Sequence, residues 1–350
     1  MILEEIKYFQ YSFPLKSEFK NSSTSIKKRE GFIISARDEF KNISYGEASP
    51  LENFSVETLK ETENNLQLIT SKRIILSENI FEASNQIKEL TQLHPLRFAL
   101  EQIFLNLLFI RNNKLPDVLS GKNFKKEIYV NAVLGIYESA FIINEIKKKF
   151  NLGYKTFKIK VGRNNIQDDL SLVDSIYKNF GDKIKIRLDA NGKWEFNEAL
   201  NFLENLEKYE IEYIEEPCFN LDNNLKLIEH TRIKIALDES ITNIAQAKQI
   251  IDNSKIEFII IKPMIYGSIF DIIDLINYAE SKNKFIIISS AFESNIGKSA
   301  LVLLASLTSH TYAHGLDAAD IFSNNFDDFY KVNNGRINFN IDFFPPRYDL

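Results

Sequence analysis

Between about Tyr129 and Asp320 the sequence alternates short apolar runs with longer amphipathic stretches. The apolar runs are rich in Ile, Val and Phe, as expected for strands that are buried on both faces. The stretches between them, such as Asn197–Tyr209 and Ile269–Ser281, have the apolar spacing of helices. We predict strands at Tyr129–Ile136, Thr156–Val161, Ile184–Leu188, Ile211–Ile214, Lys234–Leu237, Phe258–Ile261, Phe285–Ile288 and Ala313–Leu316.

This alternation predicts an α/β protein built on a (β/α)8 barrel of the TIM type, because strand–helix units repeat through the region. An open doubly wound sheet is the alternative. It would have fewer strands and a Gly-rich phosphate-binding turn after the first strand. No such turn follows Tyr129–Ile136, so the pattern favours the barrel.

The first part of the chain has a different pattern. Alternating apolar residues in Ile2–Phe13 and Gly31–Arg37 predict two strands, and the polar segment Ser17–Arg29 between them predicts a hairpin loop, with a mobile lid as the alternative. Helical periodicity follows from Ser55 to about Ile69 and twice more before residue 112. We therefore predict an α+β unit over 1–112, the barrel over 113–322, and a return over 323–350 that packs on the first unit.

The composition restricts the class of protein, its partners and its compartment, but it does not indicate a function. The 350 residues suffice for one large domain and a smaller one, and a formal net charge of −5 gives no reason to expect nucleic acid or an anionic membrane as partner. Cys218 is the single cysteine, which excludes an internal disulfide and fits a reducing compartment. The start lacks the pattern of a secretory signal, and the apolar runs are too short to cross a bilayer. We expect a cytoplasmic protein.

Five of the predicted strands end in ionisable groups. Because catalytic groups of such barrels lie at the C-terminal ends of the strands, we expect these side chains to meet at one rim. Three adjacent carboxylates without His or Cys suit Mg²⁺, and Mn²⁺ is the alternative. The groups are Lys158 and Lys160 on the second strand, Asp189, Glu215 and Asp238 on the third to fifth, and Lys262 on the sixth.

Strand geometry refines the assignment. Taken singly, an acid at a strand end more often caps a helix or pairs with a lysine, so the argument rests on the ordered set. Glu215 and Glu216 point to opposite sides of a strand, and we predict Glu215 as the ligand and Glu216 as its support. Lys158 and Lys160 point to the same side, into the barrel, where like-charge proximity would lower the pKa of one lysine and make it a usable base.

The loop after the seventh predicted strand carries candidate substrate contacts. Ser289, Ser290, Glu293 and Ser294, with Gly297 at a helix start, could offer hydroxyl and backbone N–H donors to a substrate carboxylate. An ordinary loop with a helix cap is the alternative. We add Arg187 and Asn191, which flank Asp189, as further predicted substrate-binding residues.

This ordered set resembles the enolase superfamily, in particular its muconate-lactonizing-like subgroup with Lys-x-Lys on strand two and one Lys on strand six. The resemblance covers nearly the whole chain and implies an N-terminal capping domain completed by the C-terminal tail. Ser289-Ser290-Ala291-Phe292 stands where the mandelate racemase kind carries a His. The stretches most like the o-succinylbenzoate synthase family are Gly46–Leu51, Arg187–Asn191, Glu215–Cys218, Leu237–Ser240, Ile261–Pro263 and Gly315–Asp317.

The resemblance implies Mg²⁺ on Asp189, Glu215 and Asp238, and an enediolate formed when Lys160 removes the proton α to a substrate carboxylate. It also implies that Lys158 lowers the pKa of Lys160 and that Lys262 remains a cation that stabilises the intermediate. The implied activity is a dehydration that yields o-succinylbenzoate in menaquinone biosynthesis. A racemase of N-acylamino acids or a dipeptide epimerase would use the same residues, although Leu316–Asp320 lacks the Asp-x-Asp spacing of the epimerases. A Schiff-base aldolase using Lys262 and a non-catalytic metal-binding barrel are two competing hypotheses from different classes. The sequence carries no signal for the oligomeric state.

Overall fold

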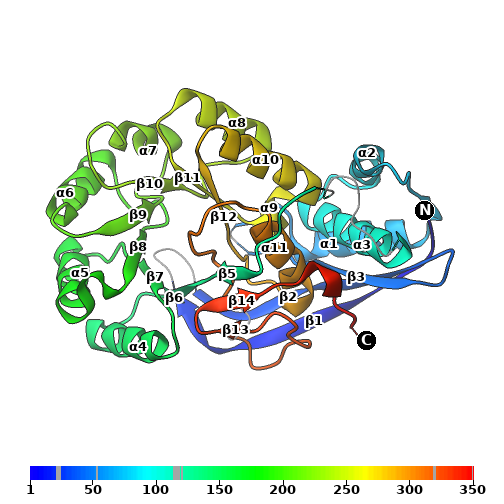
Figure 1. Ribbon diagram of the computed structural model, residues 1–350, viewed down its shortest axis with the longest axis horizontal. Helices are drawn as coiled ribbons and strands as arrows, with labels where there is room; N and C mark the ends of the chain where they lie inside the picture. The colour runs from blue at the N-terminus through cyan, green and yellow to red at the C-terminus, as the bar shows by residue number, and fades with distance from the viewer. Residues whose placement is uncertain (21–24, 53, 113–118, 120, 318–320, 349) are drawn as a thin grey trace.

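The computed structural model describes residues 1–20, 25–52, 54–112, 119, 121–317, 321–348 and 350. Figure 1 shows a ring of alternating strands and helices, green to orange, beside a smaller unit drawn in blue and cyan. The smaller unit is the N-terminal part of the chain, and the ring is the predicted barrel. The α/β class and the two-part organisation therefore agree with the sequence pattern.

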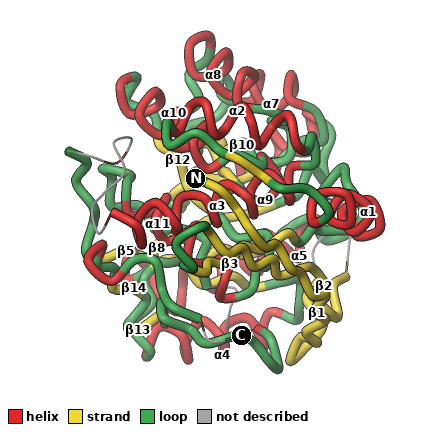
Figure 2. The backbone as a smooth tube through the Cα atoms, turned by 90° about the vertical axis from the view of Figure 1, so that its right-hand side faces the viewer, coloured by secondary structure: helices red, strands yellow, loops and turns green. Residues whose placement is uncertain are grey.

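The N-terminal unit, here called the capping domain, is an antiparallel sheet covered by three helices. The strand order is β3-β2-β1-β4, and β1 and β2 form one long hairpin. Helix α3 packs along β3, where Gly46 lets the two backbones approach closely (Figure 2). The elements are β1 (Ile2–Lys20), β2 (Ser25–Asp38), β3 (Ile43–Ala48), α1 (Leu59–Thr70), β4 (Ile74–Ile75), α2 (Ile80–Leu90) and α3 (His94–Asn112).

The hairpin corrects one prediction. Ser17–Lys20 and Ser25–Arg29 are strand, paired as Phe19 with Ile26 and Lys20 with Ser25, rather than loop. Cross-strand hydrogen bonds satisfy the backbone whatever the side chains are, so the polar composition of this segment concealed its pairing. Residues 21–24, where a lid would turn, lie outside the described residues.

Seven parallel strands in sequential order form the barrel wall. Helices alternate with them as predicted, and the strand bounds agree with the predicted ones to within a few residues. The strands are β6 (Asn131–Leu134), β7 (Thr156–Lys160), β8 (Lys185–Asp189), β9 (Ile211–Glu215), β10 (Ile235–Leu237), β11 (Phe258–Ile261) and β12 (Phe285–Ile288). The helices are α4 (Ser139–Asn151), α5 (Ile166–Phe180), α6 (Phe196–Leu206), α7 (Leu221–Leu227), α8 (Ile244–Asn253), α9 (Pro263–Tyr266), α10 (Ile269–Ser281) and α11 (Asn295–Ser306).

The eighth predicted strand closes the ring through two isolated β-bridges, without forming a full strand. His314 bridges Val130 and Gly315 bridges Ser289, both in parallel, so this segment joins the first barrel strand to the last. Backbone hydrogen bonds on both sides complete the junction, including Asn131 N–H to the His314 carbonyl and Gly315 N–H to the Ile288 carbonyl, at 3.0 and 2.9 Å. The barrel is therefore closed, as the (β/α)8 prediction requires.

The tail contacts both parts of the molecule. Phe322 bridges Leu15, and the ring of Phe326 packs against that of Phe13 on β1. The predicted strand Arg336–Ile341 behaves differently from expectation, because it pairs with the segment before the barrel and not with the capping sheet. It forms a three-stranded sheet of β13 (Val332–Asn333), β14 (Arg336–Asn338) and β5 (Glu127–Tyr129).

The apolar core lies between the strands and the surrounding helices and continues into the capping domain. A separate small cluster of Tyr213, Ala236, Phe258, Ile260 and Ile287 fills the barrel interior. This filling closes the lower part of the barrel, so the space for a ligand lies at the C-terminal ends of the strands. None of the helices that the structure describes combines the length and the apolar composition needed to cross a bilayer.

Candidate active site

The register of the barrel strands brings the predicted lysine and carboxylate residues to the same height in the barrel. Lys160 pairs with Asp189, and Asp189 pairs with Glu215, across β7, β8 and β9. Lys158 lies two residues earlier on β7, and its side chain reaches upward to the same carboxylates. Phe157 and Ile159 belong to the core outside the barrel wall, so the predicted inward direction of both lysines is confirmed.

The lysines and carboxylates form a buried network. The Lys158 ammonium lies 2.7 Å from the Asp189 carboxylate and 2.5 Å from that of Glu215, and it donates a hydrogen bond to Glu215. Lys160 donates to Asp189 at 2.5 Å and to the Asn191 side-chain oxygen at 2.6 Å. Across the barrel, Lys262 forms an ion pair with Asp238. All of the predicted lysines and acids therefore meet in one place.

Opposed charges set the proton affinities here. Burial alone would lower the pKa of Lys158, but Asp189, Glu215 and Asp238 outweigh burial and hold that pKa well above its ordinary value. Burial opposes ionisation of Asp189 too, yet the two lysines hold its pKa far below the usual range. Lys262 has a raised pKa because Asp238, Glu239 and Glu215 outweigh its burial.

Glu215 marks the place where this network lacks positive charge. Burial first, and then the neighbouring charge of Asp189, raise the pKa of Glu215 well above its ordinary value. Its second oxygen, Oε2, is buried and has no hydrogen-bond partner. A buried acceptor in this state costs free energy unless a donor or a cation reaches it.

A hard divalent cation fits this donor set, because Asp189, Glu215 and Asp238 offer oxygen ligands, Glu215 has an unsatisfied acceptor, and the charges of Asp189 and Asp238 act on it. Among the described residues, no three acidic, His or Cys side chains already form a metal-binding group. Instead, ammonium groups of Lys158, Lys160 and Lys262 hold the carboxylates. Cation binding would therefore require these lysines to release carboxylate oxygens.

Glu216 points away from the network, as predicted, and supports the next strand end. Its Oε1 accepts hydrogen bonds from the backbone N–H groups of Asp238 and Ser240, at 2.6 and 2.9 Å. Its Oε2 accepts from the Asn224 side chain at 2.7 Å. Burial and the nearby charge of Glu239 raise the pKa of Glu216 to about 8. Glu216 thus fixes where Asp238 lies relative to Glu215.

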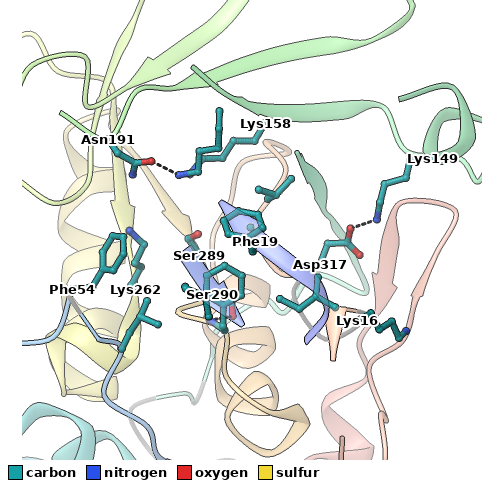
Figure 3. A pocket seen from close by; sticks show the side chains of 17 residues that line it. Lys16, Phe19, Phe54, Lys149, Lys158, Asn191, Lys262, Ser289, Ser290 and Asp317 are labelled. Carbon is teal, nitrogen blue, oxygen red and sulfur yellow. Dashed lines mark hydrogen bonds and ion pairs between the residues drawn. The ribbon is translucent and has the colours of Figure 1, made fainter. Parts of the chain in front are cut away.

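The network opens into a cavity of about 300 Å³ between the barrel rim and the capping domain. Figure 3 shows Lys158 and Lys262 directed into this space, with Phe54 from the capping domain beside Lys262. The Lys262 ammonium lies 5.2 Å from the centre of the Phe54 ring, a cation–π contact. The residues that line the cavity are Lys16, Phe19, Ile26, Leu51, Phe54, Val133, Lys149, Lys158, Lys160, Asn191, Lys262, Ser289, Ser290, Phe292, Gly315, Asp317 and Ile321.

Three of the four predicted substrate-binding residues line the cavity, namely Ser289, Ser290 and Asn191. Arg187 does not, which corrects that prediction. Its side chain is fully buried one layer below the rim, where it donates to Glu212, to Asn131 and to the Ala313 carbonyl. Lys158 pairs with Arg187 at the same level of the barrel and still reaches the cavity, so the partners of Arg187, and not its depth alone, keep its side chain away from the substrate.

Other cavity residues were not found from the sequence. Lys16 and Lys149 add positive charge, and Asp317 accepts from the Lys149 ammonium at 2.6 Å (Figure 3). Asp317 also accepts from the Tyr154 hydroxyl at 2.6 Å. Asp317 belongs to the stretch Leu316–Asp320, but Lys149 is the last of three consecutive lysines on α4, a run that suggests a solvated helix face. Residues 318–320, the rest of that stretch, lie outside the described residues.

Comparison with known families agrees with this geometry. Residues 142–341 match the model of the enolase C-terminal domain-like family, and residues 3–85 match that of the MenC N-terminal domain. The chain belongs to the enolase superfamily. The lysines and carboxylates thus lie in a superfamily barrel, and the hairpin and helices before them correspond to its capping domain.

Individual relatives agree with this superfamily assignment along most of the chain. The chain is 26% identical over 328 residues to the o-succinylbenzoate synthase of Aliivibrio salmonicida, covering 93% of both proteins. It is 29% identical over 334 residues to Protein PHYLLO, chloroplastic, of Arabidopsis thaliana, but spans only 19% of that protein. A dipeptide epimerase from Enterococcus faecalis complexed with Mg and the dipeptide L-Leu-L-Tyr has the same fold, with a TM-score of 0.86 at 23% identity over 97% of this chain and all of that one.

Proposed function

We propose that this protein is a Mg²⁺-dependent dehydratase that converts 2-succinyl-6-hydroxy-2,4-cyclohexadiene-1-carboxylate to o-succinylbenzoate, a step of menaquinone biosynthesis. The observation that carries the proposal is the convergence of three buried lysines on Asp189, Glu215 and Asp238 beneath a capping domain that matches the MenC model. Full-length similarity to an o-succinylbenzoate synthase supports the choice of reaction.

Asp189, Glu215 and Asp238 would hold the Mg²⁺ ion. When bound, Mg²⁺ supplies positive charge to the substrate carboxylate as negative charge develops on it. Lys158 remains a cation, because the carboxylates around it raise its pKa, and it keeps those buried acids compensated. Lys262 is the second fixed cation and faces the substrate from the position directly after β11. The site therefore stabilises negative charge from two sides.

Lys160 is assigned the proton transfers because it lines the cavity from the end of β7. Its amine takes the proton on the ring carbon α to the carboxylate. The bond between the neighbouring ring carbon and its hydroxyl group then breaks, and Lys160 returns the proton to the departing oxygen as water leaves. The electron pair of the broken C–H bond becomes part of the aromatic ring, so atoms and charge balance.

The cavity lining supports an anionic substrate. Lys16, Lys149, Lys158, Lys160 and Lys262 line it, and the substrate carries two carboxylates. The Lys149 ammonium already contacts the carboxylate of Asp317. The ammonium group of a dipeptide would have to compete with Lys149 for this carboxylate, which favours the synthase over a dipeptide epimerase.

A racemase or epimerase is the second candidate, because Lys160 at the end of β7 and Lys262 directly after β11 line the cavity from separate places on the rim. Two bases on opposite faces of one carbon would exchange its proton with solvent. Deuterium incorporation into an N-succinyl amino acid, without dehydration of the cyclohexadiene, would favour this candidate.

A Schiff-base reaction at Lys262 is less consistent with the site. The nucleophile of such a reaction is a neutral amine, whereas Asp238, Glu239 and Glu215 raise the pKa of Lys262 and keep it protonated. Borohydride trapping of a carbonyl substrate would reveal it. A non-catalytic barrel would bind Mg²⁺ and substrate without turnover.

The test is an absorbance assay with the cyclohexadiene substrate, with and without Mg²⁺. We expect turnover with Mg²⁺ and its loss in Lys160→Ala, with substrate binding retained by calorimetry. Most activity remaining in Lys160→Ala would contradict the role of this lysine.

A further inference from the structure

The loop that follows β12 forms one wall of the cavity and adopts a strained conformation. Ser289, Ser290 and Phe292 line the cavity, and Figure 3 shows both serines at its edge. Phe292 has a φ of 62°, in the left-handed region that a bulky residue rarely occupies. Such a conformation is strained and persists only where the surroundings hold it. The contacts that hold this loop therefore determine the shape of the cavity wall.

Glu293 holds the loop from the barrel side. This side chain is 1% exposed, and its Oε2 accepts from the Ser290 hydroxyl at 2.5 Å and from the Ala291 N–H at 2.8 Å. The Ser290 oxygen in turn accepts from the Phe292 N–H at 2.9 Å. One carboxylate thus fixes the turn from Ser290 to Phe292. The Ser290 proton, which we predicted for a substrate carboxylate, is directed to Glu293 instead.

The capping domain holds the same loop from the other side. Arg29 on β2, 3% exposed, donates to the Phe292 carbonyl at 3.1 Å and to the Pro50 carbonyl at 2.7 Å. Glu47 on β3, fully buried, accepts from the backbone N–H groups of Ser294 and Gly297, each at 3.0 Å. The start of α11 is thus bound to a carboxylate of the capping domain rather than open to a substrate.

Gly297 allows the two carboxylates to approach. A Cβ atom there would lie 2.8 Å from both a Glu47 oxygen and the Glu293 Cβ atom, so a side chain would force Glu47 and Glu293 apart. The loop is consequently held between a barrel carboxylate and two capping-domain side chains. Loss of any one of them should release the strained Phe292 conformation.

We propose that Glu293 is a positioning residue for the reaction, which sets the cavity wall formed by Ser289 and Phe292, and that Arg29 and Glu47 complete this wall when the capping domain is docked. Glu293 does not line the cavity, so it acts through the loop. The kinetic part of this inference rests on the proposed function, whereas the loop conformation can be measured without turnover.

The test compares Glu293→Ala with Glu293→Gln, which retains an acceptor oxygen for Ser290 and Ala291. The two readouts are the kinetic constants for the cyclohexadiene substrate and amide hydrogen exchange over residues 290–293. We expect Glu293→Ala to raise KM tenfold or more with kcat within threefold, since the loop binds substrate but does not contact the reacting atoms. Exchange at Ala291 and Phe292 should become faster. Glu293→Gln should stay within threefold of the wild type in both constants.

Glu101→Ala is the matched control. Glu101 is a fully buried capping-domain carboxylate that also contacts the barrel, accepting from the Ser268 hydroxyl at 3.0 Å and the Phe270 N–H at 3.3 Å. It does not contact the loop, so its loss should lower stability but leave KM and exchange at residues 290–293 unchanged. The same rise in KM in Glu101→Ala would show a general effect of capping-domain attachment and overturn the proposal.

Two further outcomes are decisive. Wild-type KM and wild-type exchange in Glu293→Ala would overturn the positioning role. If Glu293→Ala does not fold, Ser290→Ala replaces it, because it removes the hydroxyl that accepts from the Phe292 N–H. Faster exchange at Phe292 in that variant supports the proposal, and unchanged exchange refutes it. Absence of turnover in the wild type would reject the proposed function, while the exchange comparison would still decide the role of Glu293.

Discussion

Lys158 and Lys160 are identical in type and two residues apart, yet the structure predicts different effects on stability when each is replaced with Ala. The Lys158 ammonium compensates two buried carboxylates, at 2.7 and 2.5 Å, whose side chains are 0% and 1% exposed. Lys160 contacts one carboxylate, that of Asp189, which Lys158 also contacts. The pair of variants removes the same atoms from neighbouring positions and is therefore internally controlled.

The expected magnitudes follow from what each variant leaves behind. Lys158→Ala leaves Glu215 without its Oε1 donor, and Oε2 has none already, so both oxygens become buried and unpartnered. Breaking a buried ion pair in this way costs about 3–5 kcal/mol. Because Glu215 can take up a proton, we expect the lower end of that range. Lys160→Ala leaves Asp189 paired with Lys158 and removes two hydrogen bonds, to Asp189 and to Asn191, which should cost about 1–2 kcal/mol in total.

The assay is urea unfolding in the presence of a chelator, followed by the fluorescence of Trp194, the single tryptophan, which packs against Phe202 in the barrel. Lys158→Ala should lower the free energy of unfolding by about 2 kcal/mol more than Lys160→Ala does. Both variants should lose turnover, by about 10²- to 10⁴-fold for Lys160→Ala. Equal destabilisation, or a larger effect of Lys160→Ala, would refute the assignment of Lys158 as the cation that compensates both acids.

Three other predictions follow from the same contacts. Chelation should abolish turnover and excess Mg²⁺ should restore it, and chelator-resistant turnover would contradict the metal site. Glu215→Gln should weaken Mg²⁺ binding in calorimetry by roughly tenfold or more. Burial and the charge of Glu47 raise the pKa of Glu293 to about 7, although hydrogen bonds oppose the shift. The stability that the protonated Glu293 carboxyl contributes is therefore present below pH 4.5 and is lost as the pH rises toward 7. Glu293→Gln should therefore gain about 3 kcal/mol relative to the wild type over this interval in urea titrations, and a constant difference would contradict it. Gly46→Ala should lower the free energy of unfolding by about 1–3 kcal/mol, because its Cβ would overlap the Ala99 carbonyl oxygen, and an unchanged urea midpoint would show that α3 can shift away.

Much of the barrel could be predicted because its strands carry a local signal. Runs such as Phe258–Ile261 and Phe285–Ile288 are bounded as predicted, since strands buried on both faces admit few polar residues. The direction of Lys158 and Lys160 followed from strand parity alone. Order along the chain and the closed ring then placed the charged strand ends at one rim.

The level at which a side chain lies in the barrel, and its contacts with distant segments, could not be predicted from the sequence. Arg187 shares the inward direction of Asp189, but parity does not state at which level of the barrel a side chain stops, and its partners Asn131 and the Ala313 carbonyl come from distant segments. Lys149 enters the cavity lining through an ion pair with Asp317, 168 residues away. Neither contact has a local pattern. The strand character of Ser17–Lys20 was hidden for the same reason, because its pairing lies in backbone hydrogen bonds.

For the loop after β12, the sequence predicted the correct location but only part of the function of its residues. Ser289 and Ser290 do line the cavity, but the hydroxyl of Ser290 and the N–H groups of Ser294 and Gly297 are directed to Glu293 and Glu47. Glu47 is 247 residues from Ser294, so only the docked capping domain reveals that these donors are already used.

The central claim is that Lys160 dehydrates a cyclohexadiene carboxylate in a Mg²⁺-dependent reaction. The most direct measurement is the change in absorbance of 2-succinyl-6-hydroxy-2,4-cyclohexadiene-1-carboxylate on mixing with the wild type, with Lys160→Ala, and with the wild type in chelator. We predict conversion to o-succinylbenzoate only by the wild type with Mg²⁺. No conversion by the wild type, together with Mg²⁺-dependent deuterium exchange into an N-succinyl amino acid, would contradict the claim and identify a racemase instead.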